Sequence, residues 1–265
     1  YLAALVMFAM GCRTFESRWI RKLGWVSWLA ASYLVGWWLT GSHAAGVAAV
    51  LIWFCLPAIE IAVRLRGLRF PLRQEVKGRF APSREYFPEL EEYTEEVLEA
   101  GYAQIEDAGW EAMDGEHFVR LFYDEERRTQ AAIHLDYEEG MGLSYVTLTT
   151  RMEDGRAFMT TSYPYPSPME FSPRQVVRGF ADAETIRELE ERHQKLLEEN
   201  DVVPEKRLQL DTEQLATLLE EEIGLLVDHN IKRGLIEKSG EDKFRYSWRG
   251  CLFFWLRMVK TMIRN

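Results

Sequence analysis

Residues 26–54, VSWLAASYLVGWWLTGSHAAGVAAVLIWF, contain no Asp, Glu, Lys or Arg. They lie within two apolar runs, residues 23–39 and 46–63, and a helix needs about 20 mainly apolar residues to cross the core of a bilayer. Gly41, in the short linker, can adopt the positive φ that the end of a helix often requires. We therefore predict an antiparallel transmembrane hairpin over residues 23–63; the alternative is a buried helical hairpin of a soluble protein.

The side chains of the two runs fit such a hairpin. Tryptophan favours the boundary between membrane and water, and a pair of tryptophans lies near each end of the first run: Trp25 and Trp28, then Trp37 and Trp38. Small residues allow two backbones to approach closely, on which helix association in lipid depends. They are Ala30, Ala31 and Gly36 on the first run and Ala45, Gly46, Ala48 and Ala49 on the second.

Basic residues flank the predicted hairpin on both sides, whereas its turn contains no Lys or Arg. Arg13, Arg18, Arg21 and Lys22 precede it, and Arg64, Arg66, Arg69 and Arg73 follow it. Because cytoplasmic loops of membrane proteins are enriched in Lys and Arg, both flanks are expected in the cytoplasm and the turn near Ser42 outside. The predicted location is an inner (plasma) membrane, crossed more than once, with the bulk of the chain in the cytoplasm.

Residues 1–12 are also wholly apolar but too short to span a bilayer, and they can be the end of an earlier transmembrane helix. Four regions are then predicted along the chain. They are a membrane region over residues 1–79 (partial helix 1–12, hairpin 23–63, basic linker 64–79), a cytoplasmic α+β domain over 80–200, a helix with a β-hairpin over 201–248, and an amphipathic helix over 249–265.

The formal net charge of −10 hides an uneven distribution. Residues 1–79 carry ten basic and three acidic residues, a net charge of +7, and residues 249–265 carry four basic residues and no acidic ones. Residues 80–248 hold the other 18 basic and 39 acidic residues, a net charge of −21. An acidic, water-soluble centre thus lies between basic, apolar ends, and its charge opposes binding to the phosphates of a nucleic acid.

The acidic centre begins with a pattern typical of an α+β domain. Apolar residues at helical spacing predict a helix over residues 82–100 that ends at Gly101. Four alternating segments separated by short turns then predict a four-stranded antiparallel meander: EHFVRLFYD, TQAAIHLDY, LSYVTLTTR and GRAFMTTSY. A turn at Asp154-Gly155 places Thr147, Thr149 and Arg151 opposite Ala157, Met159 and Thr161, within about one residue of register. Their threonines indicate a plain sheet face or, alternatively, a surface that lines a ligand.

A proline-rich segment, YPYPSPMEFSP, interrupts regular structure after the strands. The next helix is predicted to have Asp182 as its N-cap, and its apolar stripe consists of Ile186, Leu189, His193, Leu196 and Leu197. His193 follows Glu190 at the spacing that a di-iron helix uses, but the chain has no second copy of this motif. We therefore interpret His193 as a packed or boundary histidine, with a functional role as the alternative.

The last part of the acidic centre predicts a helix over residues 212–230 and a hairpin that turns at Ser239-Gly240. Over about 35 residues this resembles the last helix and wing of a winged-helix module, without a recognition helix rich in basic residues. The terminal segment, WRGCLFFWLRMVKTMIRN, places Arg257, Lys260 and Arg264 on one stripe of an amphipathic helix. Such a helix is expected to lie in the lipid headgroup layer or, alternatively, to dock on a protein partner.

Two further features bear on function. Cys12, Cys55 and Cys251 lie in apolar segments without a disulfide or zinc spacing, so we expect buried, unpaired thiols. Glu60 is the one acid in the predicted spanning region, which makes it a candidate functional carboxylate. It lies four residues before Arg64, however, and an ion pair between them is the simpler interpretation.

The sequence contains no nucleotide-binding, metalloprotease or nucleophile motif, and we predict no cofactor, no bound metal and no nucleic-acid partner. It favours a membrane-anchored accessory or scaffold subunit of a bacterial-type inner-membrane protein complex. Its expected partners are membrane lipid and other membrane-protein subunits or copies of itself. The alternatives are a membrane-associated enzyme, with chemistry at the sheet face, the proline-rich loop or His193, and a transport or channel component with Glu60 facing a pore.

Overall fold

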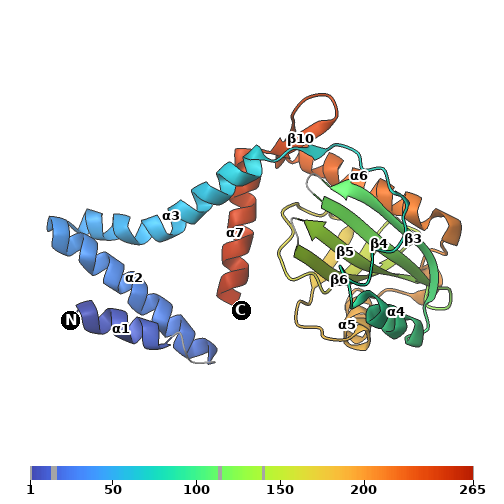
Figure 1. Cartoon of the computed structure of the whole chain (residues 1–265), viewed down its shortest axis with the longest axis horizontal. Coiled ribbons are helices and arrows are strands. Elements are labelled where there is room, and N and C mark those ends of the chain that lie inside the picture. The colour runs from blue at the N-terminus through green and yellow to red at the C-terminus, as the bar shows by residue number, and fades with distance from the viewer. Residues whose placement is uncertain (1, 13–16, 113–114, 139–140, 265) are drawn as a thin grey trace. The chain divides into compact units, whose positions relative to one another are not determined.

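The computed structural model describes residues 2–12, 17–112, 115–138 and 141–264. The chain is a mixed α+β protein with a seven-stranded sheet and one long apolar helix (Figure 1). It divides into two compact units. The helical unit consists of residues 1–65 and 255–265, and the sheet unit consists of residues 66–254.

The helical unit contains α1 (Leu2–Cys12), α2 (Arg18–Thr40) and most of α3 (His43–Gly67). Gly41 ends α2 with a φ of 67°, which confirms the predicted left-handed turn residue. The predicted approach of small residues is also confirmed: a Cβ atom added to Gly36 would lie 2.5 Å from the carbonyl oxygen of Ala45. On the same two helices, the Trp53 indole donates a hydrogen bond of 2.9 Å to Ser32 Oγ.

Among the helices of the described residues, α3 alone is long and apolar enough to cross a membrane, judged by length and composition. Its apolar side chains point outward along its length, and eight of them are between 42% and 62% exposed: Val47, Leu51, Ile52, Trp53, Phe54, Leu56, Ile59 and Val63. A helix that leaves so much apolar surface uncovered differs from the core helix of a soluble protein, which would bury it.

The sheet unit is built on seven strands in the order β2-β3-β4-β5-β6-β7-β8. They are β2 (Lys77–Gly78), β3 (Ala103–Ala112), β4 (Gly115–Asp124), β5 (Thr129–Glu138), β6 (Met141–Arg151), β7 (Ala157–Thr161) and β8 (Gln175–Gly179). Neighbours are antiparallel, except that β7 and β8 are parallel. The four predicted strands are β4 to β7, and the predicted register is confirmed, since Thr147 lies opposite Thr161 and Thr149 opposite Met159.

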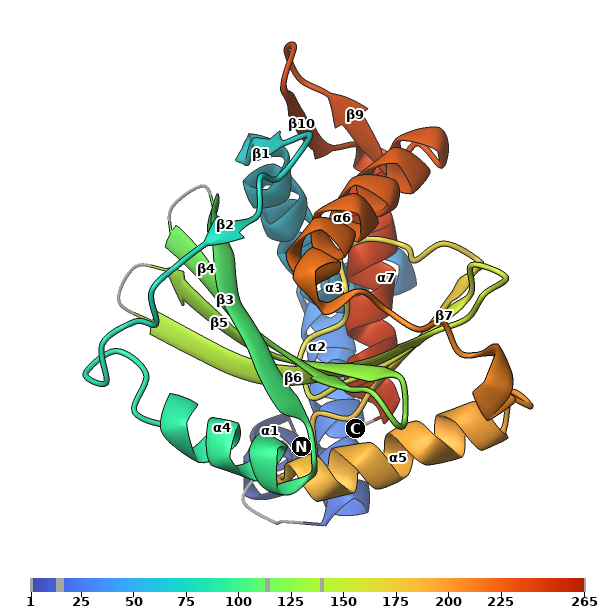
Figure 2. The same ribbon diagram turned by 90° about the vertical axis from the view of Figure 1, so that its right-hand side faces the viewer.

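Helices cover both faces of this sheet (Figure 2). On one face, α4 (Leu90–Glu99) and α5 (Ile186–Glu198) enclose a core that includes Val97, Phe118, Phe122, Ile133 and Leu189. On the other, α6 (Leu215–Lys232) begins with Leu215, which packs with Val119, Leu121, Tyr123 and Leu210. All five predicted stripe residues of α5 are buried, because the alternating strands offer α5 an apolar face.

Two predicted helix starts are wrong. The helix predicted over residues 82–100 begins only at Leu90, because the preceding residues turn and insert Phe87 into the core, where it is 6% exposed. The N-cap of α5 is Thr185, whose hydroxyl accepts a hydrogen bond of 3.2 Å from the Glu188 amide. Asp182, the predicted cap, instead binds Arg192 at 2.7 Å.

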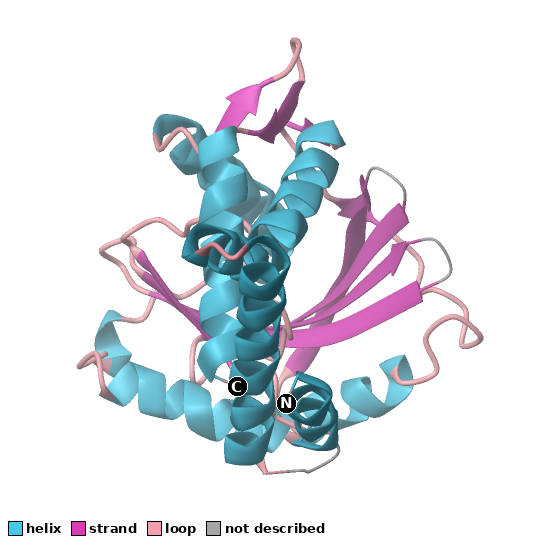
Figure 3. Cartoon of the chain, turned by 90° about the vertical axis from the view of Figure 1, so that its left-hand side faces the viewer, coloured by secondary structure: helices cyan, strands magenta, loops and turns pink. Residues whose placement is uncertain are grey.

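The predicted C-terminal hairpin is present and turns at Gly240, whose φ is 99°. It consists of β9 (Ile236–Lys238) and β10 (Lys243–Tyr246), and the segment β1 (Phe70–Pro71) joins them in a separate three-stranded sheet (Figure 3). Short 3-10 helices span Pro204–Lys206 and Thr212–Gln214, and α7 spans Trp248–Arg264.

The cysteines form no disulfide in the described residues. Cys12 and Cys251 are buried, as predicted, but Cys55 is exposed. The prediction for Cys55 is wrong because this residue lies on α3, whose apolar surface the other described elements leave largely uncovered.

Candidate functional site

The residues predicted from the sequence lie in separate places. Glu60 accepts a hydrogen bond of 2.8 Å from Arg64, the pair expected at this spacing, which leaves a pore-lining role without support of its own. Trp25, Trp28, Trp37 and Trp38 lie on α2. Arg257 and Lys260 lie on α7, and Arg264 is the last residue of that helix, with a side chain outside the described part.

His193 lies in the core of the sheet unit and is 0% exposed. Its Nε2 is 2.9 Å from the Thr150 hydroxyl, and its Nδ1 is 3.2 Å from the Thr160 hydroxyl. Burial, with a smaller contribution from the Arg207 charge, lowers the pKa of His193 to about 4. His193 is therefore a neutral, packed side chain, held by the threonines of β6 and β7.

Glu190, the other member of the di-iron spacing, forms an ion pair with Arg127 instead of approaching His193. Within the described residues, no group of three or more His, Cys, Asp or Glu side chains is placed to hold a metal ion. The two residues of the motif therefore have separate structural roles: His193 packs in the core, and Glu190 forms an ion pair with Arg127.

A chain of hydrogen-bonded side chains crosses the sheet face opposite α4 and α5. Asp136 Oδ1 binds His117 Nδ1, His117 Nε2 lies 3.1 Å from His134 Nδ1, and His134 Nε2 lies 2.9 Å from Thr147 Oγ1. We call these four residues the histidine chain. Their alignment follows from strand register: His117 lies opposite Asp136, and the four side chains share a face of β4, β5 and β6 because side chains alternate along a strand.

One arrangement of protons satisfies every nitrogen of the histidine chain with both imidazoles neutral. His117 donates from Nδ1 to the Asp136 carboxylate, His134 donates from Nδ1 to His117, and the Thr147 hydroxyl donates to His134. Burial, together with the nearby His117, lowers the pKa of His134 well below its usual value, which keeps its ring neutral. A hydroxyl that donates to an imidazole, backed by a carboxylate, is the arrangement that activates nucleophiles in hydrolases.

Aromatic rings enclose the histidine chain. Trp110 stacks on His117 with 3.8 Å between ring centroids, and Tyr145 stacks on His134 at 4.6 Å. Tyr163, from the predicted proline-rich segment, meets Tyr145 edge-on at 4.8 Å. Burial raises the pKa of Tyr145 and Tyr163, so both phenols stay protonated at neutral pH. The Asp136 side chain is 39% exposed, so the histidine chain has contact with solvent at this end.

Sequence reasoning missed His117, His134 and Asp136 and included Thr147 only as part of a sheet face. A signal was present, because both histidines fall at inward positions of correctly predicted strands, where a polar side chain needs a buried partner. Their pairing could not be read, since it depends on the register between β4 and β5.

Comparisons with protein-family models, curated proteins and solved structures gave no match to this chain.

Proposed function

We propose that the chain is a membrane-anchored accessory or scaffold subunit of a bacterial-type inner-membrane protein complex. The observation that carries the proposal is the exposed apolar surface of α3, a helix of 25 residues. Exposed apolar area costs about 25 cal/mol per Å² in water, and a continuous patch of this kind marks a surface for lipid or for another protein. Lipid would cover the exposed apolar side chains of α3 all at once.

The packing of α2 on α3 supports a hairpin in which both helices cross the membrane. Gly36 leaves the space that Ala45 fills, so the backbones meet as they do in membrane helix pairs. The basic residues on both sides then favour a cytoplasmic location for both flanks and an external turn near Ser42. Trp37 and Trp38 lie at the C-terminal end of α2 and suit the outer interface, whereas Trp25 and Trp28 lie further inside the helix. Trp25, Trp37 and Trp38 are more than 40% exposed.

The C-terminal helix α7 supports a second contact with the membrane surface. Its apolar side chains Leu252, Leu256 and Met262 are between 57% and 62% exposed, and its sequence adds Arg257, Lys260 and Arg264 without any acid. Each basic residue near an anionic lipid surface contributes about 1 kcal/mol. The acidic residues 80–248 favour a basic surface on the partner subunit, because complementary potentials guide association.

Labelling of single cysteines tests the membrane topology. In a variant that lacks the three natural cysteines, Ser42→Cys should react with an impermeant maleimide added outside intact cells. Ser17→Cys and Ser239→Cys should react only in inverted vesicles. Labelling of Ser17→Cys from outside would leave α3 as a single span and contradict the hairpin, and labelling of Ser42→Cys only from inside would contradict the orientation.

Purification in a mild detergent tests the role as a subunit. We expect a partner protein in stoichiometric amount or a defined self-assembly, because the proposal gives the helices and the acidic region an interacting surface. A chain that purifies as a lone monomer, with no protein crosslinked to it in the cell, would contradict the scaffold role while leaving the membrane anchor intact.

The second candidate is a membrane-associated enzyme, which the histidine chain favours. In this proposal Thr147 attacks an acyl or phosphoryl centre, its proton passes to His134 Nε2, and the leaving group departs as the new bond forms. A fluorophosphonate probe should then modify Thr147 with loss of fluoride, and His134→Gln should prevent the reaction. Thr147 is only 9% exposed. Absence of labelling in the intact protein would exclude Thr147 as the nucleophile.

A further inference from the structure

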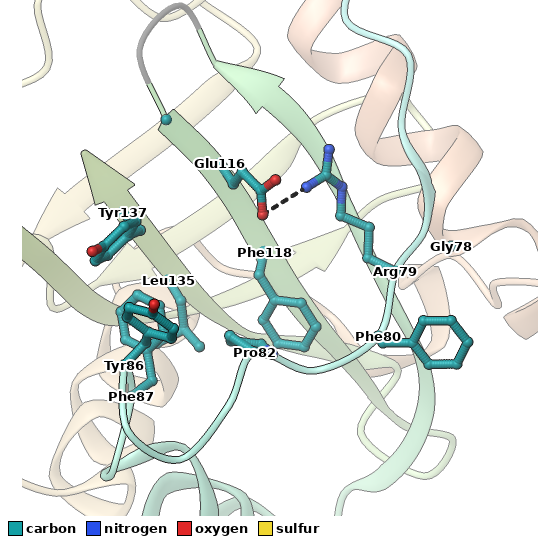
Figure 4. A pocket seen from close by; sticks show the side chains of 11 residues that line it. Gly78, Arg79, Phe80, Pro82, Tyr86, Phe87, Glu116, Phe118, Leu135 and Tyr137 are labelled. Atoms are coloured by element: carbon teal, nitrogen blue, oxygen red, sulfur yellow. Dashed lines mark ion pairs between the residues drawn. The ribbon is translucent and has the colours of Figure 1, made fainter. Parts of the chain in front are cut away.

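A pocket of about 660 Å³ opens on the sheet face that carries α4 and α5, opposite the histidine chain (Figure 4). Its floor consists of two cross-strand pairs, Glu116 with Tyr137 and Phe118 with Leu135. The segment before α4, residues 78–87, forms the remaining wall. The volume falls within the range of about 300 to 1,000 Å³ that small-molecule sites occupy, and most lining side chains are apolar.

Two glycines of the sheet make room for this wall. A Cβ atom at Gly142 would lie 2.7 Å from the Phe87 ring, and a Cβ atom at Gly109 would lie 2.3 Å from the His117 carbonyl oxygen and 2.7 Å from Arg79 Cδ. A side chain at Gly142 would displace Phe87, and one at Gly109 would meet both the paired strand β4 and Arg79, so the strands leave room for the wall. The pocket is therefore a built feature of the sheet unit and does not depend on the membrane anchor.

Aromatic rings dominate the pocket. Tyr86 meets Tyr137 at 5.2 Å with 70° between the ring planes, and Phe87 meets Tyr137 at 6.1 Å with 79°. The rings of Tyr86 and Phe87 therefore both stand steeply inclined to the ring of Tyr137. Tyr86 is 56% exposed, so aromatic surface also reaches the mouth, whereas the fully exposed Phe80 ring points away from the other lining rings (Figure 4). The faces of aromatic rings carry partial negative charge and attract cations.

The charged groups at the rim also favour a cation. Arg79 lies 3.2 Å from Glu116 and 3.9 Å from Glu111, so two carboxylates face one guanidinium. Both carboxylates are mostly in solvent, with side-chain exposures of 73% for Glu116 and 88% for Glu111. The net charge of −21 on residues 80–248 adds a long-range potential that repels anions and attracts cations.

We propose that this pocket binds an organic cation, an alkylated ammonium or guanidinium group carried on an apolar or aromatic body. The cationic group lies against the rings of Tyr86 and Tyr137 and is balanced by Glu116. The body covers Phe118 and Leu135, whose side chains line the floor.

Calorimetric titration of the full chain in a non-ionic detergent tests the ligand class. Benzyltrimethylammonium should bind, and phenylacetate and benzyl alcohol, which offer the same ring with a negative or no charge, should bind at least about fivefold more weakly. Tyr86→Leu should weaken binding of the cation about two- to fivefold. The matched control is Tyr165→Leu, because Tyr165 is similarly exposed, at 59%, but lies outside the pocket.

Substitutions of the charged residues at the rim test the proposal, because removing a negative and removing a positive charge should change cation binding in opposite directions. Glu116→Gln should weaken binding of benzyltrimethylammonium about two- to fivefold, whereas Arg79→Gln should strengthen it by a similar factor, because it removes a repelling charge and releases Glu116. Glu153→Gln, an exposed site outside the pocket, should change nothing. Tighter binding of phenylacetate than of the cation, loss of cation binding in Arg79→Gln, or no detectable cation binding would each overturn the proposal. Tyr86 and Glu116 are exposed, so their variants should fold, which circular dichroism checks.

Discussion

Lowering the pH from 7 to 5 should destabilise the sheet unit through His193. This side chain is 0% exposed, and burial lowers its pKa from 6.5 to about 4. The unfolded chain therefore binds a proton at a higher pH than the folded chain does. The stabilisation from neutral His193 is fully present above the unfolded pKa of about 6.5. It is lost as the pH falls from there through about 4.

The size of the effect follows from the shift in pKa. A fall from 6.5 to about 4 corresponds to about 3 kcal/mol of unfolding free energy once both states are protonated. Between pH 7 and pH 5 about 2 kcal/mol of this is lost. Because His193 is inaccessible, solvent screening does not reduce the figure. His134, whose pKa is also lowered, adds to the same loss in the wild-type protein.

Hydrogen exchange of the β6 and β7 amides, corrected for the intrinsic rate at each pH, measures this loss within the sheet unit of the full chain. His193→Gln keeps a hydrogen-bonding side chain beside Thr150 and Thr160 but cannot be protonated. We expect this variant to have a lower unfolding free energy than the wild type at pH 7. Between pH 7 and pH 5 it should lose about 2 kcal/mol less of this free energy than the wild type, which corresponds to about 30-fold in protection from exchange. His43→Gln, at an exposed site, is the control. An equal pH-dependent loss of stability in wild type and His193→Gln would show that His193 is not its source.

Two further predictions concern contacts inside the sheet unit. Arg151 is 8% exposed and binds Glu222 at 2.6 Å, so Glu222→Gln should lower the unfolding free energy by about 3 kcal/mol, since it leaves a buried charge without its partner; an unchanged denaturation midpoint would contradict this. A Cβ atom at Gly250 would lie 1.9 Å from the Leu235 carbonyl oxygen, so Gly250→Ala should cost about 1 to 3 kcal/mol. Hydrogen exchange in β9 and β10 should report the change, with Gly67→Ala, which meets no atom within 4 Å, as the control.

Local patterns predicted the elements whose structure depends on near neighbours. The stripe of α5 repeats at helical spacing, so its five buried residues, His193 among them, could be read from the sequence. Gly41 and the turn at Asp154-Gly155 were predicted because few residue types suit such backbone conformations. The wrong start of α4 had the opposite cause: Phe87 continues the helical pattern but is drawn into the core by distant strands.

Strands whose own residues carry no clear alternation or turn signal were not predicted. β3 contains Gly109 and several acids and lacks clear alternation, yet it pairs along its length with β4. β8 is parallel to β7, and such a pairing follows a long connection that no turn motif specifies. Both strands form because a neighbouring strand offers its backbone hydrogen bonds, β4 for β3 and β7 for β8, and this support is not visible in the residues of β3 or β8 themselves.

Charge and hydropathy are properties of the sequence alone, so the separation of basic, apolar ends from an acidic centre needs no tertiary information. The order of the four central strands also follows from the sequence, because short turns allow only neighbouring, antiparallel strands. Which side chains meet across the strands depends on the tertiary fold. The histidine chain and the aromatic pocket lie on opposite faces of the same two strands, β4 and β5, and a shift of one residue in register would exchange those faces.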